Sequence, residues 1–217
     1  MDADGRRWKD GRGVAMAAAI CGVLAAGCSL LRGGAPIEER IDLLAVLPIE
    51  NEEPASATPT DGRPPLPPEA GQVVTAAVYS VLSSSPRWRF VPDLTVAQAV
   101  AKLDAGGSLL ARALALGRAV KADGVLCGTV SRYRQRVGSE YGAREPAAVA
   151  LQLQLVSVAS GTVVWTGRFD ETQQPLSENL LNWWQFWRGG PRWFTAQEFT
   201  QLGVERLLDN LADRLEP

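Results

Sequence analysis

The segment from Ala148 to Asp170 reads AVALQLQLVSV, then ASGT, then VVWTGRFD. Its first part alternates apolar and polar residues, as a strand with one buried face does, and the predicted inner set is Val149, Leu151, Leu153 and Leu155, opposite Gln152 and Gln154. The ASGT stretch predicts a tight hairpin, because Gly161 can adopt a positive φ at no steric cost. The last part predicts a second strand that buries Val163, Trp165 and Phe169. These two strands decide the fold, and the rest of the chain is interpreted around them.

Two further strands are predicted before this hairpin. Residues 125 to about 137 complete an antiparallel meander over 123–172. The run from Ile41 to Ile49 is apolar apart from Asp42 and is ended by Pro48, which predicts a strand buried on both faces at the centre of a sheet covered by helices.

Helical spacing of apolar residues predicts the other elements. Residues 69–83 carry one apolar stripe, and helices are expected over about 95–103 and 109–121, the latter capped by Ser108 with Leu110, Leu114 and Val120 facing inward. A last helix ends near Leu215, and its start fits a capping box only loosely, with Thr195 and Glu198. We therefore predict an α/β fold: a mixed sheet with an antiparallel meander, and helices packed on the sheet in a single domain.

The first 27 residues have the organisation of a secretory signal. Basic residues precede an apolar run, 13–27, that is shorter than the roughly 20 residues of a spanning helix, and small residues precede Cys28. The stretch Leu24-Ala25-Ala26-Gly27-Cys28 resembles the lipobox of bacterial lipoproteins, although Ala25 stands where leucine is commoner. The resemblance implies cleavage after Gly27 and acylation of Cys28, for example with palmitate. An ordinary secretory signal with a chance cysteine is the alternative.

The chain is expected to divide into three parts. These are a lipoprotein signal peptide at 1–27, a lipid-anchored tether at 28–40, and a periplasm-facing α/β domain at 41–217 that contains a proline-rich loop at 51–71. That loop is interpreted as a connection, with a proline-rich ligand for a partner domain as the alternative. Ser29 follows the cysteine where an aspartate would favour retention in the inner membrane. By resemblance, the protein is expected at the outer membrane.

Composition narrows the classes of function. Removing the signal leaves 18 basic and 21 acidic residues, so no general affinity for nucleic acid is expected. Cys127 is then the one cysteine besides Cys28, which rules out an intramolecular disulfide and favours a buried thiol. The chain has no histidine, no phosphate-loop motif and no paired-cysteine motif. We expect no enzyme, no metal and no cofactor, although a serine–lysine dyad with Lys102 or Lys121 stays open.

A cluster of large aromatic residues lies near the C-terminus, at Trp183, Trp184, Phe186, Trp187, Trp193 and Phe194. On a helix, Trp184 and Trp187 share one side, while Trp183 and Phe186 lie on other sides. One apolar stripe against the core therefore cannot bury them all. The segment either covers the sheet as a second layer of core or presents an apolar patch to a partner protein or to lipid.

A row of arginines alternates along the first strand of the meander. Arg132, Arg134 and Arg136 are expected on one face, where they could hold a phosphate, a carboxylate or an anionic lipid. The alternative is a solvated face paired with neighbouring acids such as Glu140, Asp170 or Glu171. Both the arginine row and the aromatic cluster are candidate partner-binding residues.

The order of elements, together with Ala122–Val130 (ADGVLCGTV) and Ser160–Gly167 (SGTVVWTG), resembles the envelope lipoproteins related to the curli-secretion lipoprotein and to the lipoprotein activator of penicillin-binding proteins. The resemblance covers most of 41–215. It implies a non-catalytic lipoprotein that acts through protein contacts as an accessory to a secretion, transport or cell-wall complex.

Two alternatives to this function stay open. One is a subunit of an oligomeric curli-type secretion assembly, although the long membrane-inserting hairpins of such a pore are not evident, and homo-oligomerisation is left open. The other is a small-molecule binding module with a pocket beneath Trp184 and Trp187.

Overall fold

The computed structural model describes residues 37, 39–52, 65–103, 106–140, 142–173 and 192–215. The predicted signal, the predicted lipidation site Cys28, most of the proline-rich loop and the tryptophans at 183–187 lie outside this set. The described residues from Ile37 onward belong to one compact unit.

The centre of the unit is a mixed sheet with the strand order β1-β3-β6-β7, in which β2 also pairs with β3. The strands are β1 (Leu44–Val46), β2 (Glu50–Asn51), β3 (Gly124–Arg134), β6 (Ala148–Ser157) and β7 (Val163–Thr172). β1 and β2 run parallel to β3, whereas β3, β6 and β7 are antiparallel neighbours. The predicted meander is therefore confirmed.

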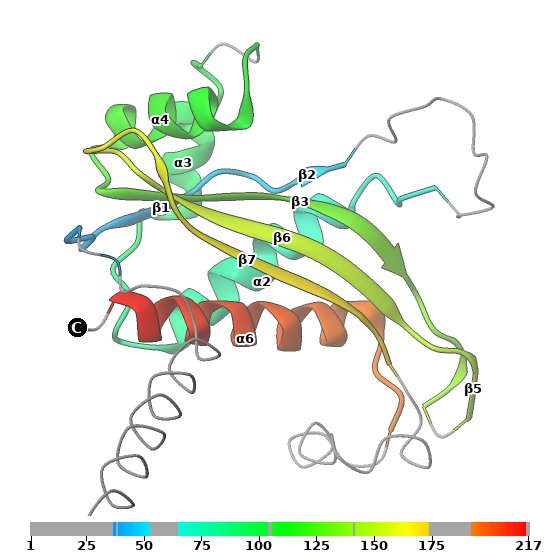
Figure 1. The fold of residues 1–217 in the computed structure, drawn as a ribbon. Coiled ribbons are helices and arrows are strands. Elements are labelled where there is room, and N and C mark those ends of the chain that lie inside the picture. Colours follow the sequence, from blue (N-terminus) through cyan, green and yellow to red (C-terminus); the bar gives the residue numbers. More distant parts are fainter. Residues whose placement is uncertain are drawn as a thin grey trace, which may run out of the picture. The chain divides into compact units, whose positions relative to one another are not determined.

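Helices cover both faces of the sheet unequally (Figure 1). α2 (Ala70–Ser84) and α6 (Ala196–Leu215) pack along one face and share the larger core cluster with β6 and β7. α3 (Asp93–Val100) and α4 (Leu109–Val120) share the smaller cluster, which lies near β1 and the start of β3. This arrangement confirms the predicted α/β fold with helices packed on a mixed sheet. Among the described helices none is long and apolar enough to cross a bilayer.

The prediction for the first strand is right about burial and wrong about position. Leu44 and Val46 belong to one core cluster and Ala45 and Leu47 to the other, so both faces are buried. The strand is nevertheless at the end of the sheet order, not at its centre. Its outer side bonds to the segment after α2, where Leu44 N donates to the carbonyl of Arg89 at 2.9 Å. A short non-strand segment therefore covers this edge.

The end of the first meander strand was also predicted wrongly. β3 stops at Arg134, and the chain continues into a separate two-stranded hairpin of β4 (Val137–Ser139) and β5 (Gly142–Glu145). At the other hairpin, Val163 is 40% exposed instead of buried. The reason is a register shift between Leu155 and Val156, which changes the phase of β7 at its first residue.

The inward face of α4 matches its prediction in part, since Leu114 and Val120 pack partly buried against the smaller core cluster. Leu110 is 37% exposed, while Ala113, Leu116 and Gly117 form the buried face. A Cβ at Gly117 would overlap the side chain of Val158, so the helix approaches the sheet through its smallest residue. The predicted cap is confirmed, because Ser108 Oγ accepts a hydrogen bond from Ala111 N at 3.2 Å.

Candidate functional site

The arginine row begins on the sheet face that α3 and α4 leave uncovered. Arg132 follows a bulge in β3 and pairs with Asp170 of β7, and Arg168 reaches the same carboxylate at 3.3 Å. The predicted pairing with Asp170 is thus present. The three side chains are between 37% and 67% exposed, so they form a solvated ion-pair cluster.

The row keeps one strand face from Arg132 to Arg134, as predicted, and ends there. Arg134, the last residue of β3, is half-buried, and its Nε is shielded from solvent with no hydrogen-bond partner among the described residues. Arg136 lies beyond the end of β3 and donates from Nη1 to the backbone carbonyl of Trp193 at 2.6 Å. The structure therefore brings together two of the predicted site residues, Arg136 and Trp193, which belong to different predicted clusters.

These contacts are part of a polar network that we call the sheet-end junction. It joins the β3–β4 connection, the end of β7 and the start of α6. Gln135 Oε1 accepts from Ala196 N at 2.6 Å, Trp193 N donates to the Glu140 carbonyl at 2.7 Å, and Gln173 Oε1 accepts from Phe194 N at 2.8 Å. The junction residues are Gln135, Arg136, Glu140, Gln173, Arg192, Trp193, Phe194 and Ala196.

A capping box completes the junction at the start of α6. Thr195 N donates to Glu198 Oε2 at 2.9 Å, and Glu198 N donates back to Thr195 Oγ1 at 3.2 Å. Arg192 pairs with the same carboxylate at 2.7 Å. Burial alone would raise the pKa of Glu198, but the hydrogen bonds from Thr195 and Arg192 outweigh it and lower that pKa. The box that the sequence fitted only loosely is therefore formed around an ionised carboxylate.

The junction fixes both ends of the segment that contains most of the aromatic cluster. Gln173 Nε2 donates to the Arg192 carbonyl at 3.1 Å. The last described residue before the segment is therefore bonded to the first described residue after it. Trp193 and Phe194 are half-buried in the junction. Trp183, Trp184, Phe186 and Trp187 lie outside the described residues, as does Cys28.

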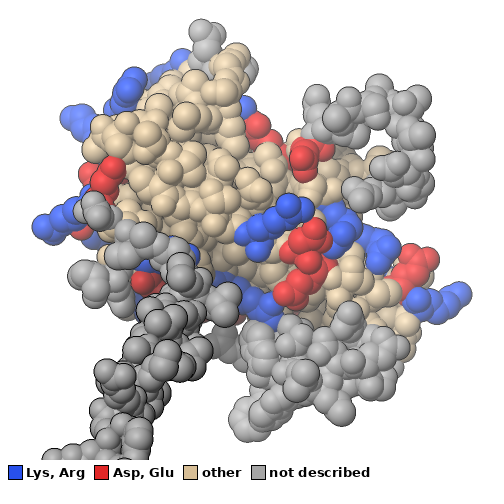
Figure 2. Space-filling model, in the orientation of Figure 1, with Lys and Arg blue, Asp and Glu red and all other residues tan. Residues whose placement is uncertain are grey.

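The uncovered part of the sheet forms a polar surface next to the junction. Residues that project on this side of β6 and β7 include Gln152, Gln154, Thr166, Arg168 and Asp170. In the space-filling view, blue and red groups lie side by side over the strands to the right of centre (Figure 2). We call this surface the open sheet face.

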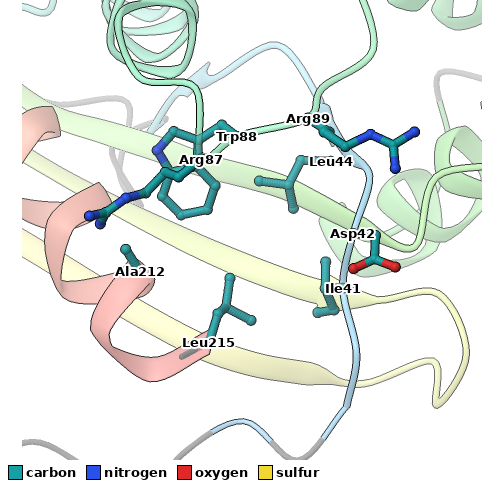
Figure 3. A pocket seen from close by; sticks show the side chains of 8 residues that line it. All are labelled: Ile41, Asp42, Leu44, Arg87, Trp88, Arg89, Ala212 and Leu215. Atoms are coloured by element: carbon teal, nitrogen blue, oxygen red, sulfur yellow. The ribbon is translucent and has the colours of Figure 1, made fainter. Parts of the chain in front are cut away.

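A small pocket lies at the opposite end of the sheet, near β1 (Figure 3). Three segments that are distant in the sequence line it, and the Trp88 ring lies among aliphatic side chains of the other two. Its volume is about 110 Å³, and its lining is Ile41, Asp42, Leu44, Arg87, Trp88, Arg89, Ala212 and Leu215. This volume is below the roughly 300 Å³ at which ligand pockets usually begin.

A second hollow of about 430 Å³ lies between α2 and α6. Small and polar side chains line it, and Glu69 is the one titratable residue in the lining. The first hollow has largely apolar walls but is too small for a typical ligand, and the second lacks the apolar walls that a small-molecule site usually has. The alternative of a pocket beneath Trp184 and Trp187 concerns residues outside the described part of the chain.

Cys127 is buried in β3, as predicted. Burial, with a smaller contribution from the negative charge of Glu50, raises the pKa of its thiol to about 11. The thiol is therefore protonated and inert at neutral pH. Within the described ranges, no three His, Cys, Asp or Glu side chains gather where they could hold a metal ion.

Solved structures with a similar arrangement include a PelC dodecamer from Paraburkholderia phytofirmans, which is 19% identical, with 82% of this chain and 92% of that one covered and a TM-score of 0.46. The LpoB C-terminal domain from Salmonella enterica is 21% identical over 70% of this chain and 94% of that one, with a TM-score of 0.40. Lipoprotein GNA1162 from Neisseria meningitidis is 16% identical over 66% and 96%, with a TM-score of 0.44.

No protein-family model and no curated protein sequence matches the chain. The structural matches include the group that the sequence resembles, since LpoB is the lipoprotein activator of penicillin-binding proteins. At these identities and TM-scores, the similarity lies in the arrangement of helices and strands and identifies neither a partner nor an activity.

Proposed function

We propose that this protein is a non-catalytic envelope lipoprotein that faces the periplasm from the outer membrane. Lipid on Cys28 anchors it, and the domain acts through contacts with another envelope protein, as an accessory to a secretion, transport or cell-wall complex. The contact surface consists of the open sheet face and the sheet-end junction, with Arg132, Arg134, Arg136 and Trp193. Trp183, Trp184, Phe186 and Trp187 belong to the same proposed surface by sequence.

The observation that carries this proposal is the sheet-end junction. Eight residues from three parts of the chain hold both ends of the tryptophan-rich segment next to the open sheet face. Large aromatics and arginines are the residues that contribute most often to protein–protein binding energy. Because the junction holds both ends of the segment, the segment has less conformational freedom to lose on binding, and this lowers the entropic cost of association.

Lipidation is tested by metabolic labelling with palmitate. The natural chain is expected to incorporate label, and Cys28→Ala is expected to lose it completely because the acylated sulfur is gone. Cys21→Ala is the matched control, since Cys21 lies in the segment removed with the signal, and it should label normally. Unlabelled natural protein, or label retained in Cys28→Ala, would contradict the lipid anchor.

Protein contact is tested by photo-crosslinking in cells, with a crosslinker at Gln152 on the open sheet face. We expect a discrete crosslinked band with an envelope protein, and we expect R132Q/R134Q/R136Q to reduce it about tenfold, which corresponds to about 1.4 kcal/mol. The fold should persist, because Arg132 loses one exposed ion pair, worth at most about 1 kcal/mol, and Arg136 loses one hydrogen bond to a backbone carbonyl, worth about 1.5 to 3 kcal/mol.

Arg87→Gln with Arg89→Gln is the matched control for this experiment. These two arginines are exposed and lie at the other end of the sheet. They should leave the crosslinked band unchanged. An absent band, or one that is equally strong in the triple variant, argues against a contact surface at this position.

A further inference from the structure

β7 is the last strand of the sheet, and among the described residues its only strand partner is β6. An unpaired strand edge presents backbone donors and acceptors that can bind another strand. The other end of the sheet differs, because residues 89–91 bond to β1. The described fold thus has one covered edge and one uncovered edge of ten residues.

The hydrogen-bond phase of β7 follows from two backbone bonds. Gln173 N donates to the Ala147 carbonyl, and Val158 N, one residue after the end of β6, donates to the Asp123 carbonyl. In an antiparallel pair, residues whose backbone groups point to the partner alternate with residues whose groups point away. With the register Leu153↔Gly167, the backbone N–H and C=O groups of the odd-numbered residues of β7 point towards β6. The backbone groups of Thr166, Arg168, Asp170 and Thr172 therefore point outward.

These outward residues limit how β7 can pair with β7 of a second copy. A two-fold axis requires an outward residue opposite an outward residue, so the axis passes through 168, 169 or 170 near the middle of the strand. An axis at Arg168 opposes two arginines, and an axis at Asp170 opposes two aspartates. An axis at Phe169 instead places Arg168 opposite Asp170 of the second copy, twice.

The side chains favour the register centred on Phe169. Arg168 and Asp170 are 67% and 38% exposed and lie on the open sheet face, where a second copy could reach them. Thr166 would lie opposite Thr172 of the second copy, and threonine pairs are favourable across strands. A run of like charges protects many strand edges from self-association. The β7 edge instead carries the opposite charges of Arg168 and Asp170, so it is complementary to the same edge of a second copy.

We propose that two copies of this chain associate through their β7 edges as an antiparallel two-fold pair. The axis passes through Phe169, and Arg168 of each copy faces Asp170 of the other. The two sheets then form one continuous sheet across the dimer. This closed pair differs from a ring subunit, because each copy uses the same β7 edge and that edge is then not available to a third copy.

The test uses two affinity tags on full-length protein that is coexpressed and extracted in detergent. Natural protein should co-purify with itself. R168D should not co-purify with R168D, nor D170R with D170R, because each combination places like charges opposite each other. R168D should co-purify with D170R, since the opposite charges then face again. We expect at least about a tenfold difference between like and mixed combinations.

The mixed combination also controls for folding, because it contains the same two variants. Failure of the natural protein to co-purify overturns the proposal. Undiminished association of R168D with itself, or failure of the mixed combination, overturns the register. None of these outcomes depends on palmitate labelling or on the partner crosslink, so the dimer and the proposed function can fail separately.

Discussion

A Phe199→Ala variant is expected to lose about 3 to 5 kcal/mol of unfolding free energy, the usual cost of removing a buried phenylalanine ring. Phe199 is 1% exposed and is among the largest fully buried side chains. Its ring meets Phe169 of β7 edge to face, with centroids 5.4 Å apart and planes at 70°. The truncation therefore removes one of the main apolar contacts between α6 and the last strand of the sheet. Urea unfolding followed by circular dichroism measures the loss.

Leu94→Ala is the control for this variant. Leu94 lies on α3 and is 67% exposed, so its truncation should change stability by no more than about 0.5 kcal/mol. A loss below about 1 kcal/mol for Phe199→Ala would mean that the packing of α6 on β7 contributes little to the fold.

The elements predicted correctly are those whose signal is local. Alternation along β6 and the apolar stripe of α2 both match the buried residues, because each pattern needs only the geometry of its own element. The cap at Ser108 needs only the three residues that follow it. Local chemistry was therefore sufficient to predict the fold class.

The predictions that failed depend on pairing between distant residues. The apolar run at 41–49 shows that both faces are buried, but which strands lie beside it depends on residues about 80 positions later. The exposure of Val163 depends on a register shift in the pairing with β6, which turns this residue to the opposite face from Trp165 and Phe169. Periodicity within one segment carries no information on either point.

In the candidate site too, the contact within the meander was predicted and the contacts between more distant parts of the chain were not. The pairing of Arg132 with Asp170 was foreseen because both residues belong to one meander. The bond from Arg136 to Trp193 was not, since it spans 57 positions and ends on a backbone carbonyl. Gln135 and Gln173 have no sequence signal for their roles. Each is an ordinary polar residue until the fold places it beside an unpaired backbone amide.

A Gly128→Ala variant is expected to lose about 3 kcal/mol of unfolding free energy, at the upper end of the cost of overpacking. Gly128 lies in the middle of β3, opposite Leu153 of β6. A Cβ there would overlap the backbone carbonyl of Gln152 and approach the Leu153 side chain to 3.1 Å. No rotamer change can relieve an overlap with a backbone carbonyl, so the two strands have to separate. The lost stability is measured as a lower urea midpoint.

Gly106→Ala is the matched control, because nothing lies within 4 Å of a Cβ at that position and its φ is not positive. It should leave the midpoint unchanged or raise it slightly, since alanine restricts the unfolded chain more than glycine does. The comparison separates the general effect of replacing glycine from close strand packing. If Gly128→Ala were as stable as Gly106→Ala, β3 and β6 would have room to adjust, and the glycine would not be what sets their close approach.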